Sequence, residues 1–299
     1  MATRAEIEET YNYMDEIFRE SFGEHADLSC AFFDGDLGKT LEQAQRDKHR
    51  LILDQLRIGP GSRVLDVGCG WGPLLEALGD RGAHGVGITL STPQQETCLR
   101  GGYECYLMDW RDVTPATFGT FDGVTAIGSP EHFCSPDEYR AGLQDQVYAR
   151  FFQLCSSLLR DGGRVYVQSM VWGRNAPAFE AISLDAPKGS NAYMTALLGA
   201  FYPGTFVAFG AEQLIRCASP WFREVYRSEG RDDYIATMDR WGAYEDWSPR
   251  KLWLARKLLW PYLTDAGFRR KIAALRAGNN RECFRRDILT LCRLVLEKT

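Results

Sequence analysis

Three closely spaced glycines follow an apolar stretch, and their spacing predicts a ligand-binding turn. Residues 64–72 read Val-Leu-Asp-Val-Gly-Cys-Gly-Trp-Gly and run directly into the helical pattern of residues 73–78. Gly68, Gly70 and Gly72 allow the chain to turn tightly between strand and helix, and they let a ligand lie against main chain where a β-carbon would collide with it. The turn is therefore predicted to seat a cofactor.

Polar and aromatic side chains follow the next predicted strands. Thr89 to Gln94 stands after the strand-like residues 85–89, where a nicotinamide enzyme would carry an acidic residue for its ribose. Asp109 and Trp110 follow residues 104–108 and offer a carboxylate and an aromatic face, which suits an adenine. Ligands collect at the carboxyl ends of the strands in such sheets, so we expect Gly68, Gln94, Trp110 and Glu131, which follow the first four strands, to share one crevice.

The elements that must position these residues alternate between strand and helix. Strands are predicted at 64–67, 85–89, 104–108, 124–127 and 164–167, with Asp161-Gly162-Gly163 among the separators. After residue 172 the pattern is mainly helical, up to a closing strand at 288–296. The pattern predicts an α/β, doubly wound, mainly parallel sheet with helices on both faces.

Composition agrees with an enzyme of one large domain that carries an insertion. The chain has 299 residues, of which 45% are hydrophobic, and residues 1–20 are acidic and mixed, unlike a signal peptide. No apolar run approaches the roughly 20 residues that span a bilayer. Nine cysteines, without C-x-x-C spacing, indicate neither a disulfide framework nor a metal site. We expect a cytoplasmic protein with reduced thiols.

Charge is unevenly distributed along the chain. Residues 250–299 hold 13 Lys or Arg against 4 Asp or Glu, which leaves −14 for the first 249 residues of a chain whose net charge is −5. This basic end suits a solvated helix face, or contact with an anionic membrane surface or an acyl carrier. No pattern of basic and aromatic residues predicts nucleic-acid binding.

These features occur together in a family that the chain resembles: the cyclopropane-fatty-acid and mycolic-acid cyclopropane synthases, class I enzymes dependent on S-adenosyl-L-methionine (SAM). The similar segments, in family order, are 28–33, 40–45 with Lys48, 64–72, 87–91 with Gln94, 109–112, 131–133, Tyr148, 151–152, 163–164, 168–169, 201–204, and Tyr234 with Trp241. The resemblance implies a seven-stranded methyltransferase sheet. It also implies a helical cap over the cofactor at 1–60, a SAM-binding domain at 61–299, and an acceptor-pocket insertion at 172–250.

The resemblance implies a set of SAM-binding residues: Ser29, Asp66, Gly68, Gly70, Thr89, Ser91, Gln94, Asp109, Trp110 and Arg111. Gly68 and Gly70 would face the amino-acid part of SAM, Gln94 would bind the ribose, and Trp110 would stack on adenine. The alternative makes Trp110 a core aromatic residue and Gln94 a helix cap. Transfer of the methyl group would leave S-adenosyl-L-homocysteine (SAH).

An alkene acceptor would need further chemistry. Methyl transfer to a double bond leaves a carbocation, which must be shielded from water and relieved of a proton by a positioned base. In the family that base is a bicarbonate ion, and the matching positions here are Cys30, Glu131 and Tyr234. Packing is the alternative for Cys30, and for His132 we expect a core or helix-start role.

The resemblance places the acceptor pocket at Phe133, Gln168, Trp172, Phe201 and Tyr202. Aromatic faces there would stabilise the carbocation. Ordinary packing is the alternative for each aromatic residue. The chain departs from the family pattern at Leu28, Pro130 and Gln168, the last of which replaces a histidine of the phospholipid-acting members. Extra residues also lie within 134–146. The acceptor is therefore less well specified than the methyl donor.

Three functions follow from these observations. The first is a C-methyltransferase that acts on an olefinic carbon of a hydrophobic small-molecule or lipid acceptor, with cyclopropanation or methyl branching as the outcome. The second is a small-molecule N- or C-methyltransferase of secondary metabolism, for which bicarbonate would be dispensable. The third is a SAM-binding regulatory protein without turnover, which the intact Gly68, Gly70, Gln94 and Glu131 disfavour.

Overall fold

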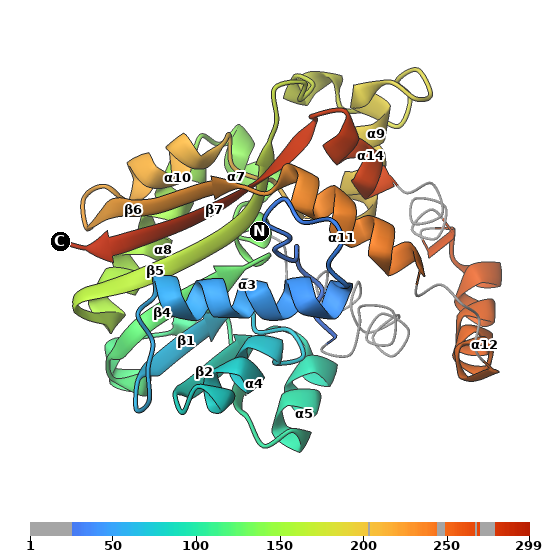
Figure 1. Ribbon diagram of the computed structural model, residues 1–299. Helices are drawn as coiled ribbons and strands as arrows, with labels where there is room; N and C mark the ends of the chain where they lie inside the picture. The colour runs from blue at the N-terminus through green and yellow to red at the C-terminus, as the bar shows by residue number, and fades with distance from the viewer. Residues whose placement is uncertain (1–25, 203, 244–248, 267, 270–278) are drawn as a thin grey trace.

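The computed structural model describes residues 26–299 except 203, 244–248, 267 and 270–278 (Figure 1). Seven strands form one sheet in the order β3-β2-β1-β4-β5-β7-β6. They are β1 (Arg63–Val67), β2 (His84–Thr89), β3 (Glu104–Leu107), β4 (Phe121–Ile127), β5 (Leu159–Trp172), β6 (Phe222–Glu229) and β7 (Leu289–Lys298). Strands β1 to β5 pair in parallel, and β7 runs antiparallel to both β5 and β6. This is the seven-stranded methyltransferase arrangement that was predicted.

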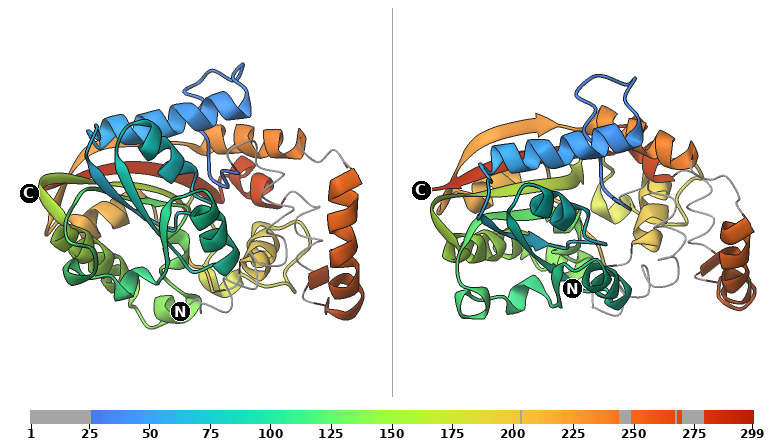
Figure 2. Two further views of the ribbon diagram at one scale, coloured as in Figure 1. Left: turned by 90° about the horizontal axis from the view of Figure 1, so that it is seen from below. Right: turned by 60° about the horizontal axis from the view of Figure 1, so that its bottom comes forward.

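Helices cover both faces of the sheet. On one face lie α3 (Leu41–Gln55), α4 (Pro73–Asp80) and α5 (Thr92–Arg100), and on the other α8 (Gln144–Leu158) and α10 (Ala211–Ala218), as Figure 2 shows. Each set buries its apolar stripe against the strands, in two separate hydrophobic clusters. The short helices α6 (Pro115–Phe118) and α7 (Pro136–Arg140) lie in connections, and α7 occupies part of the extra segment 134–146.

Helix α3 has a start signal in the sequence. Thr40 accepts a hydrogen bond from the backbone of Gln43, whose side chain accepts one from the backbone of Thr40, so that two free N–H groups are satisfied. The buried face of α3 carries Leu41, Ala44 and Ile52 at helical spacing. The helix packs across the sheet, with Lys48 at the cavity and its last residue, Gln55, accepting a hydrogen bond from Arg164 of β5.

A third cluster lies beyond the ends of β5 and β7. Helices α9 (Asn191–Phe201), α11 (Arg231–Ala243) and α14 (Asn279–Arg285) pack there, and Cys30 and Tyr234 belong to this cluster. Helix α12 (Pro249–Thr264) lies apart from the sheet in both figures. Helices α9 and α11, which lie within the predicted insertion at 172–250, thus pack beside the carboxyl end of β5.

The sequence pattern missed one strand and misplaced the start of another. The region after 172 is mainly helical, as predicted, but it also contains β6, an edge strand that pairs with β7. Its sequence, Phe-Arg-Glu-Val-Tyr-Arg-Ser-Glu, is charged and mostly exposed, as is usual for an edge strand, so it carries no apolar strand signal. Strand β5 also begins at Leu159, before the Asp161-Gly162-Gly163 separator, with a register shift at its start. Residues 1–25 of the predicted cap lie outside the described residues.

Candidate active site

The glycine turn between β1 and α4 has the backbone that only glycine adopts readily. Gly68, Gly70 and Gly72 have φ angles of +83°, +56° and +90°. A β-carbon on Gly68 would lie 2.6 Å from Cβ of Ser129, whereas one on Gly70 would meet no protein atom within 4 Å. Gly68 therefore permits close contact with the loop after β4, and Gly70 leaves open main chain facing a cavity.

That cavity gathers most of the predicted cofactor residues. Its lining includes Ser29, Asp66, Gly68, Gly70, Thr89, Gln94, Asp109, Trp110, Arg111 and Phe133. They come from the ends of β1, β2, β3 and β4 and from the segment that precedes α3. The described part of the predicted cap, through Ala26–Ser29, Lys48 and His49, forms one wall. The predicted crevice at the carboxyl ends of the strands is thus present.

The segment after β2 is organised by local hydrogen bonds. Ser91 is the N-cap of α5 and accepts a bond from the backbone N–H of Gln94, so the cap is Ser91 and not Gln94. Ser91 is absent from the cavity lining. Thr89 Oγ1 donates a hydrogen bond of 2.8 Å to Gln94 Oε1, which orients the Gln94 amide. Gln94 is therefore held at the cavity wall by its neighbours.

Trp110 is both a core residue and a lining residue. Its ring centroid lies 5.0 Å from that of Phe133 and 5.5 Å from that of Phe151, and it belongs to the main hydrophobic cluster. The Arg111 guanidinium lies 4.6 Å from the Trp110 ring centroid and donates to the Phe133 carbonyl at 2.6 Å. The aromatic wall is therefore rigid, because packing and a cation–π contact fix it together.

Two buried carboxyls have raised pKa values. Asp66 lines the cavity, whereas Glu131, which was expected to share it, is absent from its lining. Asp66 is the fourth residue of β1, where Thr125 Oγ1 donates to it at 2.7 Å, and burial raises its pKa to about 7. Glu131 follows β4, and its Oε1 accepts a bond of 2.6 Å from the backbone N–H of Met170. Burial raises the pKa of Glu131 to about 7, although that bond lowers it. Glu131 Oε2 has no hydrogen-bond partner among the described residues.

His132 cannot serve as a charged acid near neutral pH. Burial lowers its pKa to about 4, and its Nδ1 lies 3.0 Å from Thr205 Oγ1. Its ring also meets the Tyr202 ring edge-on, at 6.3 Å between centroids. His132 is therefore a neutral residue that links the loop after β4 to the segment after α9. It ends the short 3-10 helix η2 (Pro130–His132) and lines the cavity, so it has neither the core role nor the helix-start role that the sequence predicted.

Sequence reasoning missed an ionic network under one wall of the cavity. Lys48 forms a buried ion pair with Asp27, and it donates to Ser29 Oγ at 2.6 Å. His49 Nε2 lies 3.0 Å from Asp27 Oδ2. Burial raises the pKa of Asp27, but Lys48 and His49 outweigh it and hold that pKa well below its usual range. The available signal was Lys48 itself, which falls on the buried face of α3 and needs a partner.

A second buried network, also missed, surrounds Cys30. Arg293 on β7 is fully buried and forms an ion pair with Asp233 at 2.8 Å. Its guanidinium also donates hydrogen bonds to Gln168 Oε1 at 3.1 Å and to Cys30 Sγ at 3.4 Å. Gln168 in turn donates to the Cys30 carbonyl at 3.1 Å. Arg293 Nη1 is buried without a hydrogen-bond partner among the described residues. A single arginine inside the apolar run of β7 was the sequence signal.

Tyr234 and Trp172 lie outside the cavity lining, in the cluster that contains Cys30. Tyr234 meets the rings of Trp241 and Phe284 edge-on, at 5.9 and 4.8 Å. Trp172 packs on the same cluster that contains Cys30 and Tyr234. Phe201 ends α9, and its side chain lies outside the described residues. Phe133, predicted in the acceptor pocket, lines the cofactor cavity beside Trp110.

Comparison with known proteins identifies the family. Residues 1–244 match the model of mycolic acid cyclopropane synthetases. The chain belongs to that family. It is 33% identical over 165 residues to a probable fatty acid methyltransferase of Mycobacterium tuberculosis, which covers 52% of this chain and 35% of that protein. It is 28% identical over 214 residues to cyclopropane mycolic acid synthase 2 of Mycobacterium leprae, and the match covers 66% of this chain and 65% of that protein. The match thus spans less than two thirds of either relative.

Solved structures of similar shape confirm the fold. Mycolic acid cyclopropane synthase CmaA1, complexed with SAH and CTAB, superimposes with a TM-score of 0.77 at 23% identity, over 99% of this chain and 98% of that one. Coclaurine N-methyltransferase superimposes with a TM-score of 0.71 at 16% identity, over 95% of this chain and 78% of that one. Within the described residues, no helix combines the length and apolar character needed to cross a membrane.

Proposed function

We propose that this family member is a SAM-dependent C-methyltransferase that acts on an olefinic carbon of a hydrophobic acceptor. The observation that carries the proposal is the convergence of the glycine turn, Gln94 and Trp110 on one cavity. The half-satisfied Glu131 belongs to the same loop as the lining residues Ser129 and His132. When bound, SAM supplies an activated methyl group on a sulfonium. The residues of this chain must then bind SAM and the acceptor, orient them toward each other, and exclude water.

The cavity lining fits SAM. The open main chain at Gly70 suits the amino-acid part, because a β-carbon there would enter the space beside the turn. Gln94, oriented by Thr89, would bind the ribose, and Trp110 would lie against the adenine with Asp109 at the ring edge. The Asp27, Ser29 and Lys48 network closes the wall opposite α4.

Glu131 and the Arg293 network support the proposal of a bicarbonate base. An anion near these groups would satisfy the unpartnered N–H of Arg293, and a protonated Glu131 could donate to it through Oε2. Cys30 and Gln168 hold the Arg293 side chain in place. Gln168, which replaces the family's histidine, would then act by positioning Arg293.

The acceptor would reach this region through apolar surroundings. Trp172, Tyr234 and Met194 belong to or pack on the cluster that contains Cys30. Aromatic faces of this kind stabilise a carbocation by roughly 0.5–2 kcal/mol each. The related CmaA1 was solved with CTAB, a long-chain amphiphile, which favours a chain-like acceptor here.

Contact with an anionic membrane surface is part of the same proposal. Helix α12 exposes Leu252 (56%), Trp260 (74%) and Leu263 (63%), and the exposed Arg256 lies on the same helix. The helix has four basic and no acidic residues. An aromatic and basic helix of this composition suits a lipid interface, from which an unsaturated acyl chain could be taken.

The experiment that tests the function uses SAM labelled on its methyl group and two acceptor panels. One panel holds unsaturated phospholipids and isoprenoids, and the other holds small amines. We expect label in the lipid or isoprenoid fraction, with NMR separating a cyclopropane from a branched alkene. Methylation of amines alone, at a rate unchanged when carbonate is removed, would establish the second function instead.

A further inference from the structure

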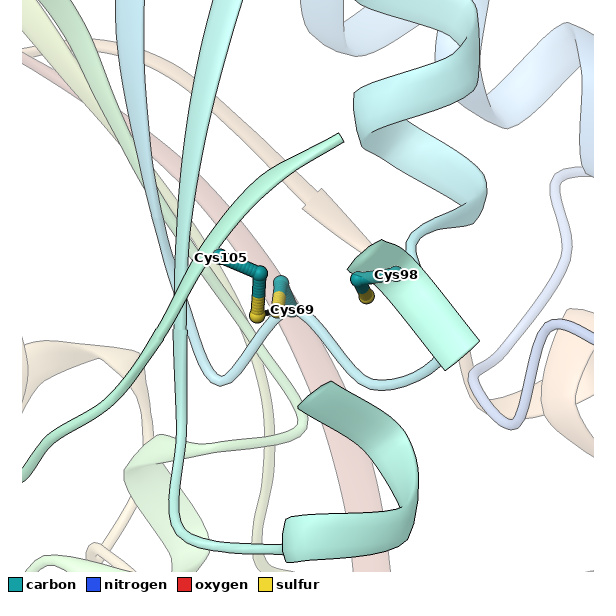
Figure 3. A group of neighbouring side chains, drawn as sticks. All are labelled: Cys69, Cys98 and Cys105. Carbon is teal, nitrogen blue, oxygen red and sulfur yellow. Dashed lines mark hydrogen bonds between the residues drawn. The ribbon is translucent and has the colours of Figure 1, made fainter. Parts of the chain in front are cut away.

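The fold assembles three cysteines that the sequence keeps apart. Cys69 lies in the glycine turn, Cys98 on α5 and Cys105 on β3, and all three are buried. Their Sγ atoms lie within 4.8 Å of one another, and those of Cys69 and Cys105 are 3.6 Å apart (Figure 3). Among the described residues, this is the one group of His, Cys, Asp or Glu side chains with such convergence. The cysteine spacing had predicted no metal site.

Gly87 makes the convergence possible. It lies on β2 between the other two strands, paired with Asp66 on β1 and with Cys105 on β3. A β-carbon on Gly87 would lie 2.7 Å from the Cys69 sulfur, so only glycine leaves room for the thiols of Cys69 and Cys105 to meet.

The separations match a metal better than a disulfide. A disulfide requires a sulfur–sulfur distance of about 2.05 Å and uses only two cysteines. A tetrahedral zinc ion with Zn–S bonds of about 2.3 Å holds its sulfurs about 3.8 Å apart, and a zinc-bound oxygen lies about 3.6 Å from each sulfur. The Gly70 carbonyl oxygen lies 3.5 Å from Cys98 Sγ and 3.8 Å from Cys69 Sγ. The distances of 3.6, 3.5 and 3.8 Å thus match edges of a tetrahedral zinc site, and the three sulfurs all lie within 4.8 Å of one another.

We propose that Cys69, Cys98 and Cys105, with the Gly70 carbonyl, bind a zinc ion that ties the glycine turn to α5 and β3. Binding would release the thiol protons, since thiolates are the ligands. Cys69 lines the cofactor cavity, which provides the ion with a path from solvent. The ion would fix three elements that carry Gly70, Gln94 and Asp109, and this inference holds whatever the methyl acceptor is.

The test measures zinc directly. Wild-type protein is loaded with Zn²⁺ under reducing conditions, desalted and analysed by mass spectrometry for metal, beside Cys98→Ser, Cys105→Ala and the control Cys155→Ala. Cys155 is a buried cysteine on α8, outside the group. We expect about one zinc per wild-type chain, at least about tenfold less in the two cluster variants, and no change in the control.

A second measurement needs no variant and covers the case in which the variants do not fold. Co²⁺ added to wild-type protein should produce thiolate charge-transfer absorption, and Zn²⁺ should protect Cys69, Cys98 and Cys105 from alkylation, as located by peptide mass spectrometry. Wild-type protein that retains no zinc and shows no such absorption or protection overturns the proposal. The proposal is also overturned if Cys155→Ala loses as much zinc as the cluster variants, or if Cys69 and Cys105 form a disulfide instead of binding zinc.

Discussion

Glu131 accepts a hydrogen bond of 2.6 Å from the backbone N–H of Met170, which anchors one carboxylate oxygen to β5 while the other, Oε2, is buried with no hydrogen-bond partner among the described residues. A buried carboxyl that is only half satisfied costs stability. Such a group is common at functional sites, where a perturbed pKa serves proton transfer. The relationship leads to two predictions.

Replacement of Glu131 by glutamine should lower kcat by about 10²–10⁴-fold while SAH affinity changes little, since glutamine keeps the shape of the side chain but lacks the acidic proton that Glu131 would share with the bicarbonate base. Single-turnover rates and calorimetric SAH titration measure the two effects. Glu180→Gln, at an exposed glutamate, is the matched control. A kcat within threefold of wild type would remove Glu131 from the chemistry.

The raised pKa of Glu131 predicts a pH dependence of stability. Its pKa rises from 4.5 to about 7 on folding, so the unfolded chain ionises first as pH increases. Glu131 should therefore lower stability between pH 4.5 and 7 by up to about 3 kcal/mol. The Glu131→Gln variant should lack this share of the loss and keep only the share of Asp66, whose pKa is also raised to about 7. Urea denaturation at several pH values tests this. Identical pH profiles for wild type and variant would contradict it.

Gly70→Ala should weaken cofactor binding without unfolding the chain. The φ of +56° is tolerated by alanine at a cost of about 1 kcal/mol, and no protein atom obstructs the new methyl group. We expect SAH affinity to fall at least about tenfold, which corresponds to about 1.4 kcal/mol. Gly142→Ala has the same backbone cost, at φ +71° and with equally open space, but lies outside the cavity. Equal SAH affinities in the two variants would exclude Gly70 from the cofactor seat.

Arg293→Met should destabilise the fold strongly. The change leaves Asp233 without its 2.8 Å partner and Gln168 Oε1 without a donor, and the loss of one member of a buried pair costs about 3–5 kcal/mol. Arg216→Met breaks an exposed pair with Asp145 and should cost about 1 kcal/mol or less. Midpoints of urea unfolding compare the two. Similar costs would mean that the Arg293 network is not a stabilising one.

Removal of apolar side chains from α12 should weaken membrane contact. The double change Trp260→Ser and Leu263→Ser should reduce sedimentation with vesicles of anionic, unsaturated phospholipid, because buried apolar area and basic charge together drive such binding. Leu37→Ser removes a leucine whose exposed fraction (60%) is similar to that of Leu263 but which lies far from α12 in the sequence, so this change should not affect vesicle binding. Equal binding by both variants would place the lipid contact elsewhere.

The sequence by itself determined the fold class and the cofactor turn. The motif around Gly68 and Gly70, the residues from Thr89 to Gln94, and Trp110 are local signals, because each depends on a strand end and the few residues after it. Their convergence follows from the rule that parallel strands present their carboxyl ends at one edge. The structure confirms that convergence for nine of the ten predicted cofactor residues, with Ser91 as the exception.

Only the tertiary structure decided which distant residues became partners. Lys48 pairs with Asp27 and Arg293 with Asp233, across 21 and 60 positions of the sequence. A buried charge needs a partner, but no regular spacing in the sequence indicates which residue that partner is. Cys69, Cys98 and Cys105 meet because Gly87 leaves room between two strands, a condition set by strand register. The charged edge strand β6 likewise exists through its pairing with β7, since its own sequence lacks an apolar face.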